Sequence, residues 1–127
     1  DMHIEIVPVP FSQLADAKPS ESSATIRARV IAARNIQTER FSHEEGVYCN
    51  AQMGSKLIRK YCQLDAKGQD LLNKAMTKHN LSARAYDRIL KMSRTIADLD
   101  NSVDIQFSHV AEAINYRNLD KESWALK

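Results

Sequence analysis

The cations with the clearest spacing are Arg84, Arg88 and Lys91, which stand four and seven positions apart from the first. In a helix this spacing places their side chains along one edge. Ser82 is a good N-cap residue, so Arg84 would lie in the first turn, where the helix dipole disfavours a cation by roughly 0.3–1 kcal/mol. A guanidinium in that position is explained if an anion comes to meet it, and guanidinium groups bind phosphate by paired, charge-assisted hydrogen bonds.

A partner for Arg84 is also available within the same helix. Asp87 lies three residues from Arg84 and four from Lys91, and ion pairs at these spacings are common on helix surfaces. The residues alone therefore leave two interpretations open. Arg84 either forms a surface ion pair with Asp87 or meets an anion from outside the chain.

The remaining reactive residues predict no catalytic or metal site. Cys49 and Cys62 form no CxxC motif, and the spacing of the four histidines is wrong for zinc. The Gly54-Ser-Lys run lacks the earlier glycine of a phosphate-binding loop. We expect no metal site, two reduced thiols and no catalytic residues within this chain.

Length and charge indicate one soluble domain. A chain of 127 residues can bury roughly two-thirds of its unfolded surface. The formal charge of +2 is too small for a dedicated nucleic-acid-binding domain, so any basic surface must be local. There is no apolar run of membrane-spanning length and no signal-peptide pattern, so we expect no membrane partner. The two reduced thiols suit a cytoplasmic protein.

The helix that carries Arg84 is the longest well-patterned element, from Ser82 to Asp100. Apolar and small residues recur on its inner side at steps of three and four. These inward residues are Tyr86, Ile89, Leu90, Ser93, Ile96 and Ala97. This helix is expected to form the centre of the fold.

Four further helices are expected, at about 24–41, 55–62, 65–79 and from 109 onward. Asp65 and Ser108 are the expected N-caps of the last two, and Asn80 is suited to a left-handed helix end. In the first of the four, Ile26, Val30, Ala33 and either Ile36 or Gln37 follow the helical period. Five helices with short connections predict an all-α helical bundle, and Trp124 is a candidate to fold back over it.

The N-terminal segment is different. His3-Ile-Glu-Ile-Val alternates like a strand, but Pro8 and Pro10 exclude a central strand, so residues 1–14 predict an edge strand or an extended arm. A polar connector follows, which places a boundary between residues 1–19 and 20–127. Because the chain starts at Asp1 without an initiator methionine, we expect it to be part of a longer protein.

Several runs resemble one protein family. They are Leu81-Ser-Ala-Arg-Ala-Tyr-Asp-Arg-Ile-Leu, Arg94-Thr-Ile-Ala-Asp-Leu, His109-Val-Ala-Glu-Ala-Ile with Tyr116-Arg, and the shorter Asn50-Ala-Gln-Met. Together they resemble the C-terminal domain of bacterial magnesium-chelatase-like AAA+ ATPases of the ComM competence-protein group. Asp1-Met-His-Ile-Glu resembles the last strand of the ATPase core in that family.

The resemblance implies a fold and a function. Residues 1–19 would be the end of the AAA+ core and a linker, and residues 20–127 a helical lid. Arg84 would be the sensor-two arginine, which contacts the phosphates of ATP. ATP and Mg²⁺ would bind only to the intact protein, an ATPase, and this fragment alone would not be an enzyme. The implied partners are the upstream core, neighbouring subunits of a hexameric ring, and DNA during uptake and recombination.

A second hypothesis is a helical module that binds DNA or docks a protein partner. Its contacts would be Arg27, Arg34 and Gln37 on the first long helix, with Arg88 and Lys91 on the central one. Arg34 and Gln37 are three residues apart and share a helix face. A module that neutralises several phosphates would lose affinity steeply as salt is raised, and this separates the two hypotheses.

Overall fold

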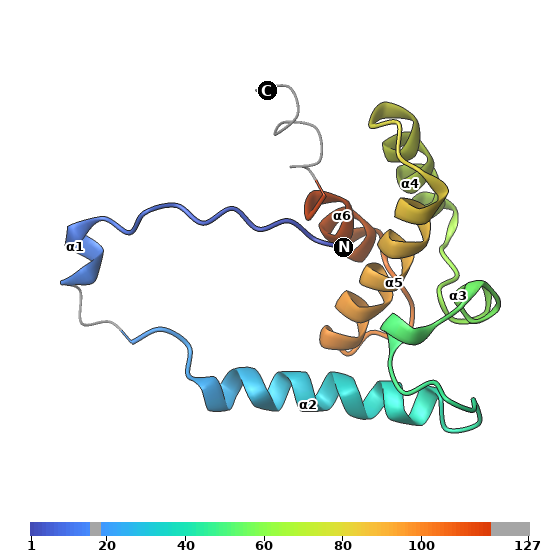
Figure 1. Ribbon diagram of the computed structural model, residues 1–127, viewed down its shortest axis with the longest axis horizontal. Helices are drawn as coiled ribbons and strands as arrows, with labels where there is room; N and C mark the ends of the chain where they lie inside the picture. The colour runs from blue at the N-terminus through green and yellow to red at the C-terminus, as the bar shows by residue number, and fades with distance from the viewer. Residues whose placement is uncertain (16–18, 118–127) are drawn as a thin grey trace.

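The computed structural model describes residues 1–15 and 19–117, and within them it contains helices and no strand (Figure 1). The prediction of an all-α fold is confirmed. Trp124 lies outside the described residues. The helices are α1 (Phe11–Leu14), α2 (Ser23–Arg40), α3 (Ser55–Tyr61), α4 (Ala66–Lys78), α5 (Ala83–Leu99) and α6 (Phe107–Asn115), with a 3₁₀ turn η1 (Asn50–Gln52).

Helix α5 is the central element of the bundle. Helices α2, α3 and α6 pack against it, and α4 packs against α6. Its start is fixed by Ser82, whose hydroxyl accepts a hydrogen bond from the Ala85 N–H at 3.2 Å. The expected inner side is buried or half-buried along its whole length, and Ile89 and Ala97 are almost completely covered.

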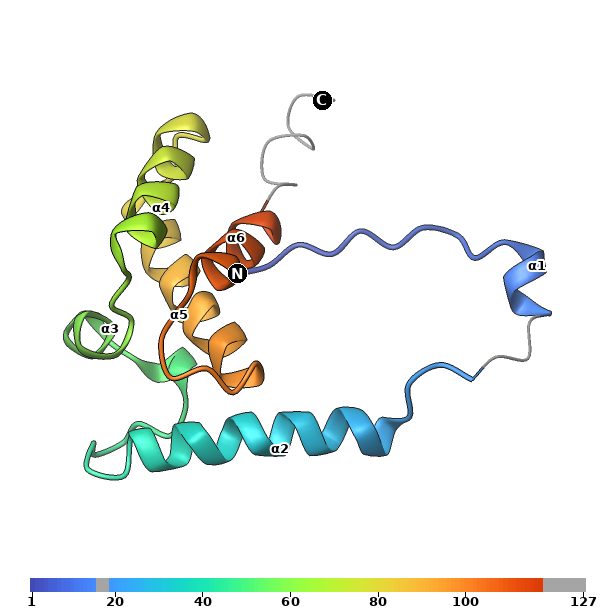
Figure 2. The ribbon, with the colours of Figure 1, turned by 180° about the vertical axis from the view of Figure 1, so that it is seen from behind.

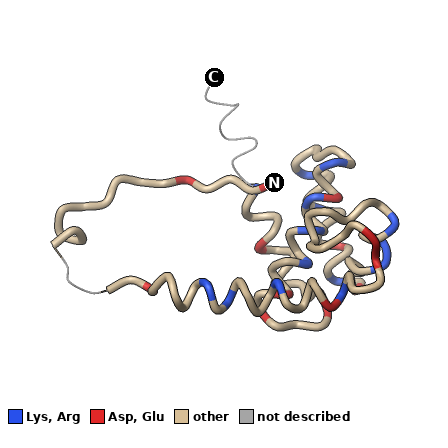
Figure 3. Tube along the Cα trace, turned by 60° about the horizontal axis from the view of Figure 1, so that its bottom comes forward, with Lys and Arg blue, Asp and Glu red and all other residues tan. Residues whose placement is uncertain are grey.

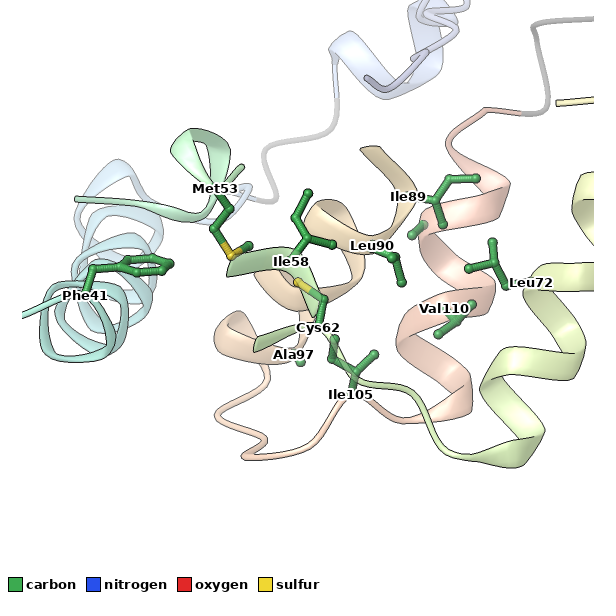
Figure 4. Packing of buried hydrophobic residues seen from close by; sticks show 11 residues of the cluster. Phe41, Met53, Ile58, Cys62, Leu72, Ile89, Leu90, Ala97, Ile105 and Val110 are labelled. Carbon is green, nitrogen blue, oxygen red and sulfur yellow. The ribbon is translucent and has the colours of Figure 1, made fainter. Parts of the chain in front are cut away.

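The hydrophobic core joins α3, α4, α5 and α6, and Phe41, the residue that ends α2, packs into it (Figure 4). Leu72 of α4, Ile89 of α5 and Val110 of α6 are the largest apolar side chains with no more than 1% exposure. At the other end of the core, the Phe41 ring packs edge-on against Tyr61, with ring centroids 5.5 Å apart. This core holds α5 in place from three sides.

The helix ends follow ordinary capping rules, with one correction. Asp65 caps α4 by accepting from the Gly68 N–H at 2.7 Å, and Asn80 is left-handed with φ of 47°, both as predicted. Helix α6, however, starts at Phe107, so the N-cap is Gln106 and the prediction of Ser108 was wrong. The Gln106 N–H donates to Nδ1 of His109 at 2.9 Å, so the buried imidazole, at the third position of the helix, satisfies the backbone N–H of the N-cap residue itself.

Helix α2 extends beyond the bundle at its N-terminal end (Figure 1). Ala33 and Gln37 are buried against the other helices, whereas Ile26 and Val30 on the same side are 42% and 46% exposed. The expectation that this side is buried along the whole helix was therefore wrong for its first half. Eighteen residues make a helix of about 27 Å, which is longer than the bundle that covers it.

The N-terminal arm is extended over residues 1–10, as predicted, and then forms the single unpredicted turn α1. Seen from behind, the arm starts beside α6 and runs away from the bundle before the chain returns to α2 (Figure 2). No helix in the described part of the chain is both long and apolar enough to cross a membrane.

Candidate functional site

Arg84 lies in the first turn of α5 and is exposed. Within residues 1–15 and 19–117, no carboxylate forms an ion pair with its guanidinium, and no hydrogen bond from the side chain is present. In particular, Asp87 does not pair with it, although Asp87 is only three residues away. The surface-pair interpretation therefore has no support in this geometry, and the guanidinium is available to an external anion.

Arg88 and Lys91 follow Arg84 along the outer edge of α5, but their charged groups point to different partners. Nε of Arg88 lies 3.0 Å from Oδ1 of Asp1, the first residue of the arm. Nζ of Lys91 donates to the Ala51 carbonyl of η1 at 3.2 Å. Of the three cations, Arg84 alone has no partner among the described residues.

The candidate residues on α2 divide into two kinds. Arg27 and Arg34 are exposed, and the tube view shows the cations of α2 along its projecting length (Figure 3). Gln37 is only 5% exposed, and its Oε1 accepts a hydrogen bond from the Asn50 N–H at 3.0 Å. Gln37 therefore has almost no surface to offer to DNA or to a protein partner, and its contact is internal.

A buried polar cluster fixes α5 to α2 and η1. The Arg40 guanidinium donates to both oxygens of Asp98, at 2.8 and 2.6 Å. Nδ2 of Asn50 donates to Asp98 at 2.8 Å, and to Thr95 at 3.1 Å. Because Asp98 is 2% exposed, this carboxylate depends on these donors in place of water.

Arg94 extends the same cluster to the loop after α5. It donates to the carbonyls of Val103 and Ser102 at 3.0 and 2.9 Å, and its Nε lies 3.3 Å from Asp98. Burial lowers the pKa of Arg94, but the nearby Asp98 carboxylate opposes this effect. The cluster holds the C-terminal half of α5 in a single orientation, and so supports the helix that presents Arg84.

The sequence reasoning did not assign this cluster, although a signal was present. Arg94 and Asp98 are four residues apart and lie beside Leu90 and Ala97, on the side of α5 that was expected to be buried. Charged residues that fall on a predicted buried side need partners inside the protein. The partner that Asp98 finds is Arg40, at the end of α2.

The described residues offer little other chemistry. They contain no group of three or more His, Cys, Asp or Glu side chains that could hold a metal ion. Cys62 is buried, and this burial raises the pKa of its thiol to about 11. Nε2 of His109 contacts Asp100 at 2.8 Å while Nδ1 accepts the Gln106 N–H, so both ring nitrogens are engaged by the start of α6 and the loop before it.

Comparison with known families supplies the identification. Residues 20–117 match the family described as magnesium chelatase, subunit ChlI C-terminal. The chain belongs to this family. The match includes every main helix of the bundle and the candidate arginine Arg84.

Curated relatives of this magnesium-chelatase C-terminal domain are much longer proteins. The chain is 42% identical over 118 residues to the competence protein ComM of Haemophilus influenzae, a match that covers 92% of this chain and 22% of that protein. It is 38% identical over 122 residues to the uncharacterised protein YifB of Escherichia coli, covering 95% of this chain and 23% of that one. The domain thus spans less than a quarter of either relative.

Proposed function

We propose that this magnesium-chelatase C-terminal domain is the helical lid of an AAA+ ATPase and that Arg84 is its sensor-two arginine. The observation that carries the proposal is the state of Arg84. It is an exposed guanidinium in the first turn of a rigidly packed helix, and no described residue neutralises it. An arginine held in this way is preorganised to bind a phosphate group.

The proposed mechanism couples the nucleotide to the position of the lid. ATP and Mg²⁺ bind to the AAA+ core upstream of the chain, and residues 1–19 form the end of that core and the linker. Arg84 on the lid contacts the γ-phosphate and stabilises the charge that develops during hydrolysis. Loss of the γ-phosphate removes this contact and shifts the lid against the core.

The wider setting is also part of the proposal. The name of the Haemophilus relative refers to competence, the uptake of DNA. We infer that the intact protein is a cytoplasmic, hexameric ATPase that acts on DNA during uptake or recombination. The lid would transmit nucleotide-driven motion between neighbouring subunits of this ring.

ATP hydrolysis by three preparations tests the assignment of the domain. The isolated chain is expected to hydrolyse no ATP, whereas the intact protein should hydrolyse it. A form of the intact protein that ends before residue 20, and so lacks the lid, should lose this activity. Hydrolysis by the pure isolated chain, in proportion to its concentration, would contradict the lid assignment.

A subunit-mixing experiment shows whose nucleotide Arg84 meets. Arg84→Ala subunits are mixed with subunits inactivated in the phosphate-binding loop of the core. If Arg84 acts on the neighbouring subunit, mixed rings recover part of the ATP turnover. If it acts within its own subunit, they recover none.

The exposed cations on α2 favour a second candidate function, in which this helix contacts DNA. Arg27 and Arg34 are seven residues apart, which places them on one side of the projecting helix, and within the described chain neither has an ion-pair partner. This function predicts that DNA affinity of the chain falls steeply with salt and that Arg27→Ala reduces the slope by about one. Affinity that does not depend on salt would exclude it.

A further inference from the structure

The first three residues of the arm each contact the bundle. Oδ1 of Asp1 pairs with Arg88 of α5 at 3.0 Å, and the His3 N–H donates to the Tyr116 carbonyl at 2.6 Å. Between them, Met2 forms part of the wall of a groove beside α5 and α6 that is lined mainly by apolar atoms. Residues of the groove wall include Met92, Ile96 and Leu99 of α5 and Tyr116 at the end of α6.

The contact is local to these three residues. Ile4, Ile6 and Val7 are 68%, 87% and 67% exposed, although they are as apolar as Met2, which is 39% exposed. An arm that simply collapsed onto the nearest apolar surface would also cover these residues. The docking of residues 1–3 therefore depends on specific partners: a charge, a groove and a backbone acceptor.

We propose that Arg88 is a positioning residue that, through Asp1, fastens the end of the core to α5 and so sets where Arg84 stands. This inference rests on the proposed lid function, in which residues 1–19 belong to the core. Arg88 is one helical turn after Arg84, so a constraint on Arg88 also constrains Arg84. The role is distinct from that of Arg84, because the Arg88 guanidinium is already engaged by a carboxylate.

The other end of α5 makes this constraint effective. Asp98 is bonded to Arg40 and Asn50 inside the protein, so α5 cannot readily slide or turn relative to α2. With α5 fixed by the buried cluster near its end and by Asp1 near its start, Arg84 has a defined place relative to the core. Release of the Asp1–Arg88 pair would leave α5 intact but allow the lid to shift.

A charge exchange in the intact protein tests the proposal. Asp1→Arg and Arg88→Asp are each expected to lower kcat for ATP hydrolysis at least fivefold, and the double exchange is expected to restore at least half of the activity. The matched control is the exposed pair Asp70–Lys74 on α4, at 2.9 Å, whose exchange should leave kcat unchanged. A double exchange no more active than the worse single variant would overturn the proposal, as would single variants with normal kcat.

A second measurement separates positioning from a merely structural role. In an Arg84→Ala background, Arg88→Asp should lower kcat no further, because both changes act through the same phosphate contact. The positioning role would be contradicted if the double variant lost kcat by the product of the two single losses. It would also be contradicted if a fall in thermal stability accounted for the lost activity. If the charge exchange fails while Arg84→Ala still abolishes turnover, the lid function stands without the Asp1 contact. If Arg84→Ala is silent, the lid function itself fails.

Discussion

The two cysteines of this domain differ in their surroundings, and their reactivity should differ accordingly. Cys62 is 4% exposed in the core, where burial raises the pKa of its thiol to about 11, while the Arg94 charge opposes this rise. Cys49 is half-buried in the loop before η1. The reactive form of a thiol is the thiolate. At pH 8 a thiol with a pKa of about 11 is a thiolate in roughly one molecule in a thousand.

We therefore predict that a thiol alkylating reagent at pH 8 adds one group to the native chain and two to the unfolded chain. Intact-mass measurement counts the additions, and Cys49→Ser should take up none while it is folded. Because folding raises the pKa of Cys62, its contribution to stability is complete below about pH 9 and is lost as the pH rises towards 11. Alkylation of Cys62 as fast as Cys49 would show that the core opens readily.

At the scale of single residues, local chemistry predicted caps but not contacts between distant segments. Ser82, Asp65 and Asn80 could be assigned because each acts on backbone within a few residues of itself. The partners Arg40 and Asp98 are 58 positions apart, so the pair depends on how α2 meets α5. The link between Arg88 and Asp1 was unpredictable for the same reason.

At the scale of elements, the joint between α2 and α5 depends on Asp98. Asp98→Ala would leave the half-buried Arg40 and the buried Arg94 without their carboxylate, and we expect a loss of about 3–5 kcal/mol in the free energy of unfolding. Asp70→Ala removes an exposed pair on α4 and should cost less than about 1 kcal/mol. Urea unfolding of both variants measures the difference, and similar losses would mean that the buried cluster does not hold the helices together.

The two halves of α2 provide another stability prediction. Val30 is 46% exposed on the projecting half, whereas Val110 of α6 is fully buried. The same change to Ala should cost roughly 2 kcal/mol or more at Val110 and less than about 0.5 kcal/mol at Val30, where alanine also favours the helix. A large loss at Val30 would show that the projecting half of α2 is covered in solution.

Helical periodicity predicted which elements exist better than how far each is covered. The five main helices and the inner side of α5 agree with the pattern. The exposure of Ile26 and Val30 could not be predicted, because periodicity identifies the side of a helix but not the length of its neighbours. The start of α6 at Phe107 was missed because its N-cap is Gln106, whose N–H donates to the His109 side chain, and glutamine is not among the usual N-cap residues.

At the scale of the whole molecule, the domain consists of a bundle and an extended arm, and among the described residues the arm meets the bundle through Asp1, Met2 and His3. The bundle was predictable because its helices are amphipathic and closely connected. The course of the arm was predictable only as extended, since Pro8 and Pro10 exclude a central strand but fix no direction. The boundary between residues 1–19 and 20–127 stays a prediction.

The measurement that tests the central claim most directly is steady-state ATP hydrolysis by the intact protein with Arg84→Ala, beside the control Arg59→Ala on the exposed side of α3. The control should be as active as the unaltered protein. Arg84→Ala should keep its fold and thermal stability but lose about 10²–10³-fold in kcat, and Arg84→Lys should recover little, because an ammonium cannot form the paired contacts of a guanidinium. Normal ATP turnover by a folded Arg84→Ala protein would contradict the assignment of Arg84 as the residue through which this lid meets the nucleotide.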